Sequence, residues 1–397
     1  MNKFTSTLAV LAITLRSFAA AGDCPALSGQ FTIGTGESAD FATITDATNA
    51  LKCGGVSGPV TFLLEDGTYS EKVVLSTIPG TSAFNTVTFE SKSGNNNNVV
   101  INYGTGDATM VLNGVSYVSF ENLTFDHKAS TYGNCMRVDG KSSNLKFKGV
   151  VFDGVETTRT GSTASCIYFT PSAPKSDIAF EDCEINNGST GISKGGMSAD
   201  AMDTKTTISG TLFFNQYESG LALTNEDAPV ITNNVVSTLS TMNGFKAINL
   251  DNVANNVIVS NNIINAANGS FGLAMNNCVA SATSNGQINN NSIAVGGTGE
   301  TYGVYLQGNT DNQVLNFNRV KLTITGQQNT NQAYYKNVGT GNNINLMNNI
   351  FYDLNSGGYT ILGNTYKDFF NQLPGQSNPT LSVSSNGIMV EKVTPIK

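Results

Sequence analysis

The 397-residue chain contains no Trp, a single His and only 13% charged residues. A single His excludes a zinc site built from several histidines. Scarce charge argues against long helices, which need Glu, Lys, Leu and Ala, whereas abundant Asn, Thr, Ser and Gly favour strands and turns. Beyond the N-terminus no apolar run reaches about 18 residues, so we expect no membrane span.

The sequence also carries little positive charge. The formal net charge is −8 and the sequence pI is about 4.7. A chain of this sign repels polyphosphates, so nucleic acid is not an expected partner.

What is present is a ten-fold repetition of a short segment with the pattern small, apolar, variable, apolar. The segments recur every 25 to 31 residues. This spacing predicts a β-solenoid in which one strand of each turn directs its apolar residues inward and stacks on the strand of the previous turn. The first apolar residues of the ten segments are Met110, Met136, Ile167, Ile192, Leu221, Ile248, Leu273, Val304, Tyr334 and Tyr359. Lys194 and Lys336 interrupt the second inward position, and we expect a bulge or a register slip there.

A second series of strands ends at recurrent polar residues, chiefly Asn. Asn tolerates left-handed backbone angles, and stacked amides hydrogen-bond from turn to turn, so we expect these residues at a bend between strands. Asn215 does not fit the series, because it precedes Asn234 by only 19 residues. The series comprises Asn122, Gly149, Asp182, Asn234, Asn262, Asn291, Asn318 and Asn349.

The N-terminus resembles a secretory signal peptide over residues 1–21. Lys3 precedes an apolar core from Leu8 to Leu15, and small residues follow at Ala19 to Ala21. This arrangement predicts an extracellular, secreted protein. A buried first strand or helix is the alternative interpretation.

Six cysteines in a secreted chain suggest disulfides, although six allow 15 connectivities. Cys24 and Cys53 flank the first expected strand and helix, where a disulfide would staple the N-terminal cap. Cys135 and Cys166 hold the same position on consecutive turns, about 4.8 Å apart, which also suits a disulfide. Stacked free thiols are the alternative for this second pair.

We expect one domain after the signal peptide. Residues 22–58 form an N-terminal strand and a capping helix, with Asp40 as N-cap and an apolar face that includes Ile44 and Leu51. Residues 59–385 form a single-stranded, right-handed parallel β-helix of roughly ten or more turns, closed by a C-terminal cap near 367–373. Residues 386–397 are a tail.

The chain resembles the right-handed parallel β-helix superfamily with the pectin-lyase-like fold. The segment Asp40 to Ala47, followed by Gly67 to Glu71, is similar to the opening of pectin methylesterases and of β-helix proteins of bacterial surfaces. The resemblance implies the fold over about residues 30–385. The catalytic segments of pectin methylesterases, polygalacturonases and alginate epimerases are missing, so no known active site transfers to this chain.

The residues that point outward from the repeated strands are the candidates for a binding surface. Arg137 and Asp139 beside Tyr168 combine charge with an aromatic ring, and a lyase could use such an arginine as base. A surface salt bridge beside an exposed ring is the alternative. Tyr305 and Tyr335 are stacked neighbours that suit a sugar-stacking platform, or simply stabilise adjacent strands.

Asp126 and Asp153 occupy equivalent positions on adjacent turns. Two stacked carboxylates repel unless they share a proton or bind a cation, and calcium is the natural ion for an extracellular oxygen site. Two solvated loop acids are the alternative. His127 lies beside Asp126, and we expect it to be exposed.

Together these features favour a secreted β-helix protein with a structural, adhesive or glycan-binding role and no required cofactor. Its expected partners are polysaccharides or components of the cell surface or matrix, with self-association as a further possibility. The alternative is a polysaccharide lyase or glycoside hydrolase that acts on an acidic polysaccharide through a groove near Arg137. This alternative rests on fold analogy.

Overall fold

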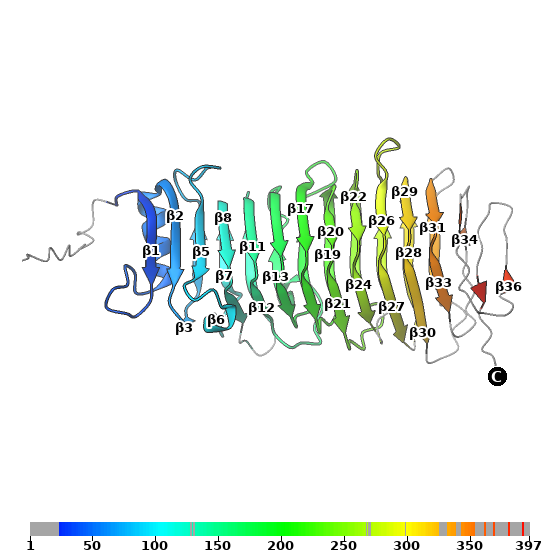
Figure 1. Cartoon of the computed structure of the whole chain (residues 1–397), viewed down its shortest axis with the longest axis horizontal. Helices are drawn as coiled ribbons and strands as arrows, with labels where there is room; N and C mark the ends of the chain where they lie inside the picture. Colours follow the sequence, from blue (N-terminus) through cyan, green and yellow to red (C-terminus); the bar gives the residue numbers. More distant parts are fainter. Residues whose placement is uncertain are drawn as a thin grey trace, which may run out of the picture.

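The computed structural model describes residues 24–127, 129, 132–266, 268, 271–297, 299–324, 332–338 and 343–353, together with four short strands beyond. The predicted signal peptide lies outside the described residues, as does most of the predicted C-terminal cap and tail. Within the described part the chain coils into an elongated rod, with α1 at its N-terminal end (Figure 1). No helix among the described residues is long and apolar enough to cross a membrane.

Each full turn of the rod contributes one strand to each of three parallel columns. The first column contains β4 (Val73–Ser76), β7 (Ala108–Asn113), β10 (Asn134–Asp139), β13 (Ile167–Phe169), β16 (Thr190–Gly195), β19 (Ser219–Asp227), β22 (Lys246–Ala254), β25 (Phe271–Asn276), β28 (Tyr302–Gly308), β31 (Gln332–Val338) and β34 (Ile361–Leu362). These are the strands that the repeated segments predict.

The second column begins at β1 (Leu27–Ile33) and runs beside the first. It continues through β2 (Val56–Leu64), β5 (Val87–Ser91), β8 (Ser116–Glu121), β11 (Ser143–Lys148), β14 (Ser176–Glu181), β17 (Asp203–Ser209), β20 (Val230–Thr232), β23 (Ile258–Ser260), β26 (Gly286–Asn289), β29 (Gln313–Asn316), β32 (Ile344–Met347) and β35 (Asp368–Phe369).

The third column is an 11-stranded parallel sheet, which sets the length of the solenoid at about 11 turns. It contains β3 (Gly67–Ser70), β6 (Val99–Tyr103), β9 (Thr124–His127), β12 (Val151–Asp153), β15 (Glu184–Asn186), β18 (Leu212–Phe214), β21 (Val235–Thr238), β24 (Ile263–Ala266), β27 (Ser292–Gly297), β30 (Arg319–Ile324) and β33 (Ile350–Asp353). Two 3₁₀ turns, η1 (Asn96–Asn98) and η2 (Ser162–Ala164), and an antiparallel pair, β36 (Thr380–Leu381) with β37 (Glu391–Lys392), complete the described elements.

The predicted inward ladder is confirmed from Met110 to Tyr334. Each of these residues pairs in register with its counterpart on the next turn, and all are buried; Tyr359 lies outside the described residues. The small residue at the start of a segment has a steric cause. At Gly303 a Cβ atom would lie 2.0 Å from the Val320 side chain and 2.5 Å from the Ala333 carbonyl oxygen.

The expected bulge or slip at the two inward lysines is wrong. Lys194 pairs in register with Phe169 and Leu223, and Lys336 pairs with Leu306. Both lysines are buried. Lys194 has buried ionic partners, which are described below.

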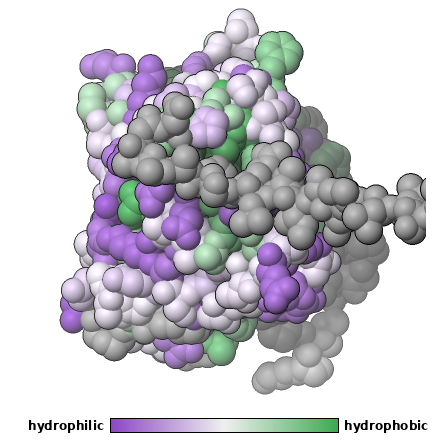
Figure 2. Space-filling view, turned by 90° about the vertical axis from the view of Figure 1, so that its left-hand side faces the viewer, coloured by the Kyte–Doolittle hydropathy of each residue, from purple (hydrophilic) through white to green (hydrophobic). Residues whose placement is uncertain are grey.

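Helix α1 (Ile44–Gly54) closes the N-terminal end of the core. Its N-cap is Thr43, whose hydroxyl oxygen accepts from the Asp46 N–H at 3.0 Å, so the prediction of Asp40 as N-cap is wrong. The Asp40 carboxylate instead accepts a hydrogen bond from the Thr32 N–H at 2.8 Å, which holds the loop between β1 and α1 against β1. Viewed from this end, the described surface is largely hydrophilic, with scattered hydrophobic residues (Figure 2).

The polar series separates into two adjacent positions. One is a column of left-handed residues that includes Asn122, Asp182, Asn233 and Asn261, with φ between 52° and 60°. The other position is the next residue along the chain, which points inward and is Asn only in later turns. The predicted series therefore combines residues from both positions. Asn215 belongs to a different corner, where its amide donates to Asn187 Oδ1 at 2.9 Å.

The inward amides form a continuous hydrogen-bonded ladder. The side-chain N–H of each Asn donates to the Oδ1 of the next at 2.9 to 3.0 Å, and a second donation at 2.7 to 3.0 Å reaches a backbone carbonyl. The expectation that amides bond from turn to turn is confirmed. The ladder comprises Asn234, Asn262, Asn291, Asn318 and Asn349, all buried.

Candidate functional site

The outward face of the first column carries an aromatic cluster formed by Phe271, Tyr302, Tyr305 and Tyr335. Tyr305 and Tyr335 pair in register on β28 and β31, and their rings stack with centroids 4.9 Å apart and planes 8° apart. Phe271 and Tyr302 also stack, with centroids 5.1 Å apart and planes 29° apart, and Phe271 meets Tyr305 edge to face at 5.1 Å. The predicted tyrosine pair is thus half of a four-ring cluster.

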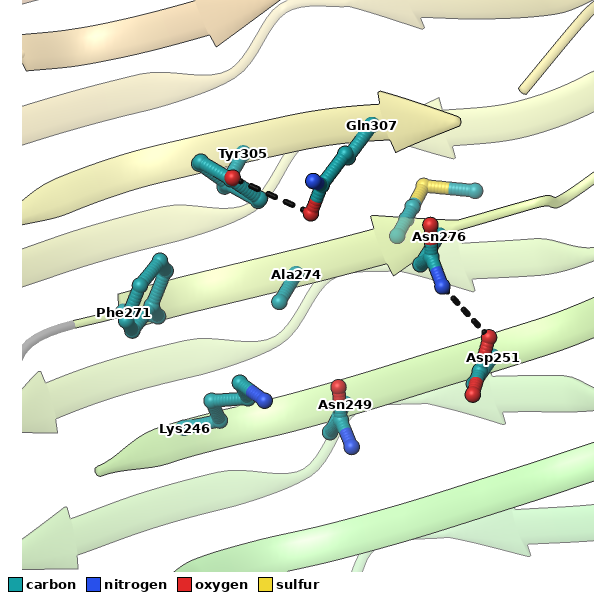
Figure 3. A pocket seen from close by; sticks show the side chains of 9 residues that line it. Lys246, Asn249, Asp251, Phe271, Ala274, Asn276, Tyr305 and Gln307 are labelled. Atoms are coloured by element: carbon teal, nitrogen blue, oxygen red, sulfur yellow. Dashed lines mark hydrogen bonds between the residues drawn. The ribbon is translucent and has the colours of Figure 1, made fainter. Parts of the chain in front are cut away.

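A pocket of about 210 Å³ adjoins this cluster. The Phe271 and Tyr305 rings form its apolar wall, and its polar lining comes from β22, β25 and β28 (Figure 3). The lining residues are Lys246, Asn249, Asp251, Phe271, Ala274, Met275, Asn276, Tyr305 and Gln307. Ring faces beside amides and a carboxylate are the groups that bind a molecule with both C–H and O–H surfaces.

The polar groups of the pocket are held in place by their own contacts. Asn276 Nδ2 donates to Asp251 Oδ1 at 2.8 Å, and the Tyr305 hydroxyl donates to Gln307 Oε1 at 3.1 Å (Figure 3). The Lys246 ammonium lies 5.9 Å from the Phe271 ring centroid. These contacts fix the orientation of the groups before any ligand arrives, which lowers the entropic cost of binding.

Burial raises the pKa of two phenols in this cluster, those of Tyr302 and Tyr305. It raises the pKa of Tyr302 to about 12, with a smaller contribution from the Glu300 carboxylate. Burial likewise raises the pKa of Tyr305. The Tyr305 hydroxyl therefore remains a neutral donor and acceptor.

The Arg137 patch is an ion-pair network. Arg137 Nε donates to Asp139 Oδ2 at 2.9 Å, and its Nη1 donates to Asp107, which also accepts from Lys72 Nζ at 2.6 Å. Lys72 holds the pKa of the Asp107 carboxyl well below its usual range, with Arg137 adding to the effect. Burial lowers the pKa of Arg137, but the hydrogen bonds to Asp107 and Asp139 outweigh it and raise that pKa. These contacts favour the salt-bridge interpretation over a catalytic base.

Tyr168 pairs in register with Arg137 on one side and Ser193 on the other. Its position is five turns from Tyr305 along the first column, about 24 Å at the usual strand spacing. The structure therefore does not bring the three predicted tyrosines together into one surface.

Asp126 and Asp153 pair in register on β9 and β12. Asp126 is buried, and Asp153 Oδ1 accepts from Asn187 Nδ2 at 2.9 Å. Among the described residues, no group of three or more His, Cys, Asp or Glu side chains is arranged to hold a metal ion. Two carboxylates are few for calcium, which takes 6–8 oxygen ligands. The calcium assignment stays a prediction.

His127 is buried, contrary to the sequence expectation. It is the last residue of β9, and its Nδ1 lies 3.1 Å from the Thr109 hydroxyl. A Cβ atom on Gly133 would lie 1.9 Å from Nε2, so the chain packs closely over the ring. Burial lowers the pKa of His127.

The cysteines divide into one disulfide and four free thiols. Cys24 and Cys53 form a disulfide that joins the segment before β1 to the end of α1. The prediction of a disulfide between Cys135 and Cys166 is wrong: both are buried free thiols whose sulfur atoms lie 3.5 Å apart. They pack as small hydrophobic residues, which was the alternative.

Comparison with known proteins gives structural neighbours only. No family model and no curated protein matches the sequence. The GH136 lacto-N-biosidase of Eubacterium ramulus superposes with a TM-score of 0.51 and 10% identity, over 86% of this chain and 68% of that one. The likeness shows the fold, a right-handed parallel β-helix.

Other neighbours of this fold have different activities. PfbA, a surface adhesin of Streptococcus pneumoniae, covers 88% of this chain and 95% of its own, with 13% identity and a TM-score of 0.46. An alginate lyase from Paenibacillus covers 80% and 97%, with 14% identity and a TM-score of 0.42. At these identities the likeness concerns the fold alone.

Sequence reasoning missed Phe271, Tyr302 and most of the pocket lining. A usable signal was present, because Phe271 and Tyr302 each lie two residues before the first apolar residue of their segments, Leu273 and Val304. Two aromatic residues at one offset on adjacent turns predict a stacked pair.

Proposed function

We propose that the protein is a secreted β-helix protein that binds a neutral glycan at the pocket beside the aromatic cluster. The observation that carries this proposal is the pocket itself, where the Phe271 and Tyr305 rings meet the amides of Asn249 and Asn276. Aromatic faces pack against the C–H surface of a sugar ring, and fixed amides bind its hydroxyls.

The charge of the pocket supports a neutral ligand. Its lining includes one ammonium, Lys246, and one carboxylate, Asp251, so no net charge selects an acidic sugar. The whole chain, at −8, repels polyanions. Secretion is supported by the Cys24–Cys53 disulfide, since such bonds persist in oxidising compartments.

Binding without cleavage is the simpler activity for this lining. Glycoside hydrolases generally use two carboxyl groups that flank the scissile bond. Among the residues that the structure describes, Asp251 is the one carboxylate that lines the pocket, and Asn276 already donates to it. The alternative is a lyase or hydrolase that uses Arg137 as its base. The Arg137 guanidinium is already bound by Asp107 and Asp139, which does not favour that role.

The test is a binding screen against neutral and acidic oligosaccharides, with product analysis of the same mixtures. For any neutral glycan that binds, we expect Tyr305→Ala and Phe271→Ala to weaken binding by about tenfold or more, which is about 1.4 kcal/mol. Tyr168→Ala is the matched control, because it removes the same side chain from a distant turn of the same face.

New reducing or unsaturated ends in these mixtures would overturn binding without turnover. If an acidic glycan binds and Arg137→Ala abolishes that binding while Tyr305→Ala does not, the site lies at the Arg137 patch instead. Equal affinity of the wild type and the Tyr305→Ala variant would remove the aromatic pocket from the proposal.

A further inference from the structure

Three ionisable side chains meet inside the solenoid, and none of them lines the glycan pocket. Lys194 on β16, Asp203 on β17 and Glu226 on β19 all have side chains with 0% exposure. Lys194 occupies an inward position that Leu223 fills on the next turn. Charges buried in this way destabilise the fold unless close partners compensate them.

The chain geometry brings these residues together closely. Lys194 Nζ contacts Asp203 Oδ2 at 2.6 Å and also contacts Glu226 Oε1. Asp203 and Glu226 are register partners on neighbouring strands. Gly196 permits the approach, because a Cβ there would lie 2.6 Å from the Asp203 nitrogen.

Each remaining polar atom of the cluster has a defined partner. Asp203 Oδ1 accepts from the Lys175 backbone N–H at 2.7 Å, and Glu226 Oε2 accepts from the Thr206 hydroxyl at 2.8 Å. The Phe169 ring, with its centroid 5.6 Å from Lys194 Nζ, forms part of the apolar surroundings. An amine thus faces a carboxyl group whose other oxygen is already held by a backbone donor.

We propose that Lys194 and Asp203 are joined by an intramolecular isopeptide bond, whose formation Glu226 promotes by transferring protons. This places a covalent cross-link inside one turn of the solenoid, across the corner between β16 and β17.

The reaction balances without any co-reactant. Glu226 takes one proton from the Lys194 ammonium and passes it to Asp203 Oδ2, which leaves a neutral amine against a neutral carboxyl. Nζ then forms a bond to Cγ, and the charge that develops on Oδ1 is stabilised by the Lys175 N–H. Nζ loses a second proton to Oδ2, the Cγ–Oδ2 bond breaks, and Oδ2 leaves as water. Glu226 ends in its starting state.

The surroundings favour these proton transfers. All three side chains have 0% exposure, so bulk water does not surround the reacting atoms. Burial, partly opposed by Lys194, raises the pKa of the Glu226 carboxyl. The reacting groups are held in contact by the fold, which replaces a bimolecular encounter by an intramolecular one.

Peptide mapping of the denatured, reduced and alkylated wild-type protein tests the proposal directly. Trypsin cleaves after Lys175, Lys194 and Lys205, but not after a lysine whose amine is acylated. We expect a single peptide, 176–205, that is one water lighter than its sequence and gives no fragments from breaks between 194 and 203. Separate peptides 176–194 and 195–205 at full mass would overturn the cross-link.

A succinimide at an aspartate also loses water, but it leaves Lys194 open to trypsin and reacts with hydroxylamine. A lighter peptide that ends at Lys194 would therefore overturn the proposal as well. The Glu226→Gln variant keeps the shape of the side chain but removes the proton carrier, and we expect it to restore cleavage after Lys194. Full cross-linking in a folded Glu226→Gln variant would remove the role of Glu226 while leaving the bond.

Discussion

The two halves of the solenoid differ in where their largest group of stacked aromatic rings lies, inside the core or on the outward face. In the N-terminal half, five phenylalanines of the second column stack inside the core with centroids 4.7 to 5.6 Å apart. They are Phe62, Phe89, Phe120, Phe147 and Phe180. In the C-terminal half the same inward position is aliphatic, as at Ile231 and Ile288, and the rings of Phe271, Tyr305 and Tyr335 lie on the outward face.

The corner beside the phenylalanine column changes in the same interval. Its inward residue is Leu123, Val150 and Cys183 in early turns and becomes the Asn ladder from Asn234 onward. The N-terminal half is thus held by ring stacking and the C-terminal half by buried amide hydrogen bonds. An internal ring stack is explained by burial, whereas an external one forgoes much of that burial and suggests a ligand.

The largest effect is expected from the internal stack. Phe147→Ala removes a fully buried ring that stacks on Phe120 at 5.6 Å and on Phe180 at 4.7 Å. We expect a loss of about 3–5 kcal/mol in the free energy of unfolding, from lost burial and the cavity. Urea denaturation followed by circular dichroism measures it, with Phe84→Ala, at an 86% exposed site, as control. A loss under about 1 kcal/mol would contradict this account of the core.

An intermediate effect is expected from the amide ladder. Asn291→Ala leaves the Asn262 side-chain N–H and the Val259 carbonyl without their partner. Unsatisfied buried groups of this kind cost about 1–3 kcal/mol, which the same denaturation experiment detects. Asn265→Ala, at an exposed position on β24, is the matched control and should be nearly neutral. Equal effects of the two variants would mean that the ladder contributes little.

A small effect on stability is expected from the external stack. Tyr335→Ala removes one ring of a half-exposed pair, so we expect a loss of about 1 kcal/mol or less. A loss comparable to that of Phe147→Ala would show that the cluster is structural and would weaken the case for a ligand.

The smallest effect is a pH dependence from His127 in the N-terminal half. Burial lowers the pKa of His127 in the folded chain. In the unfolded chain its pKa is about 6.5, so below that pH the unfolded chain binds this proton more readily than the folded chain does. Stability is therefore fully present above that pH and falls as the pH drops through the folded pKa. The difference in unfolding free energy between neutral and mildly acidic buffer should shrink in His127→Gln. An unchanged difference would show that other groups dominate.

The fold was predictable because the inward pattern repeats in every turn. Met110 and its counterparts through Tyr334 lie where the spacing places them, since an apolar alternation of period two leaves a strand only one face to bury. The helix was found, but its start was displaced by three residues. Thr43 and Asp40 are both good caps by residue type, and the hydrogen bond of Asp40 to Thr32 is a tertiary contact that no local pattern contains.

The candidate sites were predictable only where they repeat. Tyr305 and Tyr335 share one offset and were found, whereas Lys246 and Gln307 have no equivalents that mark them as a pocket. The repeat marks Lys194 as an irregularity, because its ionic partners come from the next strand and the next turn. The repeat aligns Lys194 with Leu223 on the next turn, and not with Asp203 or Glu226.

The amide ladder also has a direction along the rod. Every side-chain N–H that bonds within it points to the oxygen of the next, higher-numbered Asn, from Asn234 to Asn349. The dipoles therefore add, and each bond polarises its neighbour. Rotating the amide group of one Asn by 180° would place two donors face to face on one side and two acceptors face to face on the other. The hydrogen bonds of the ladder can therefore reverse their direction only together.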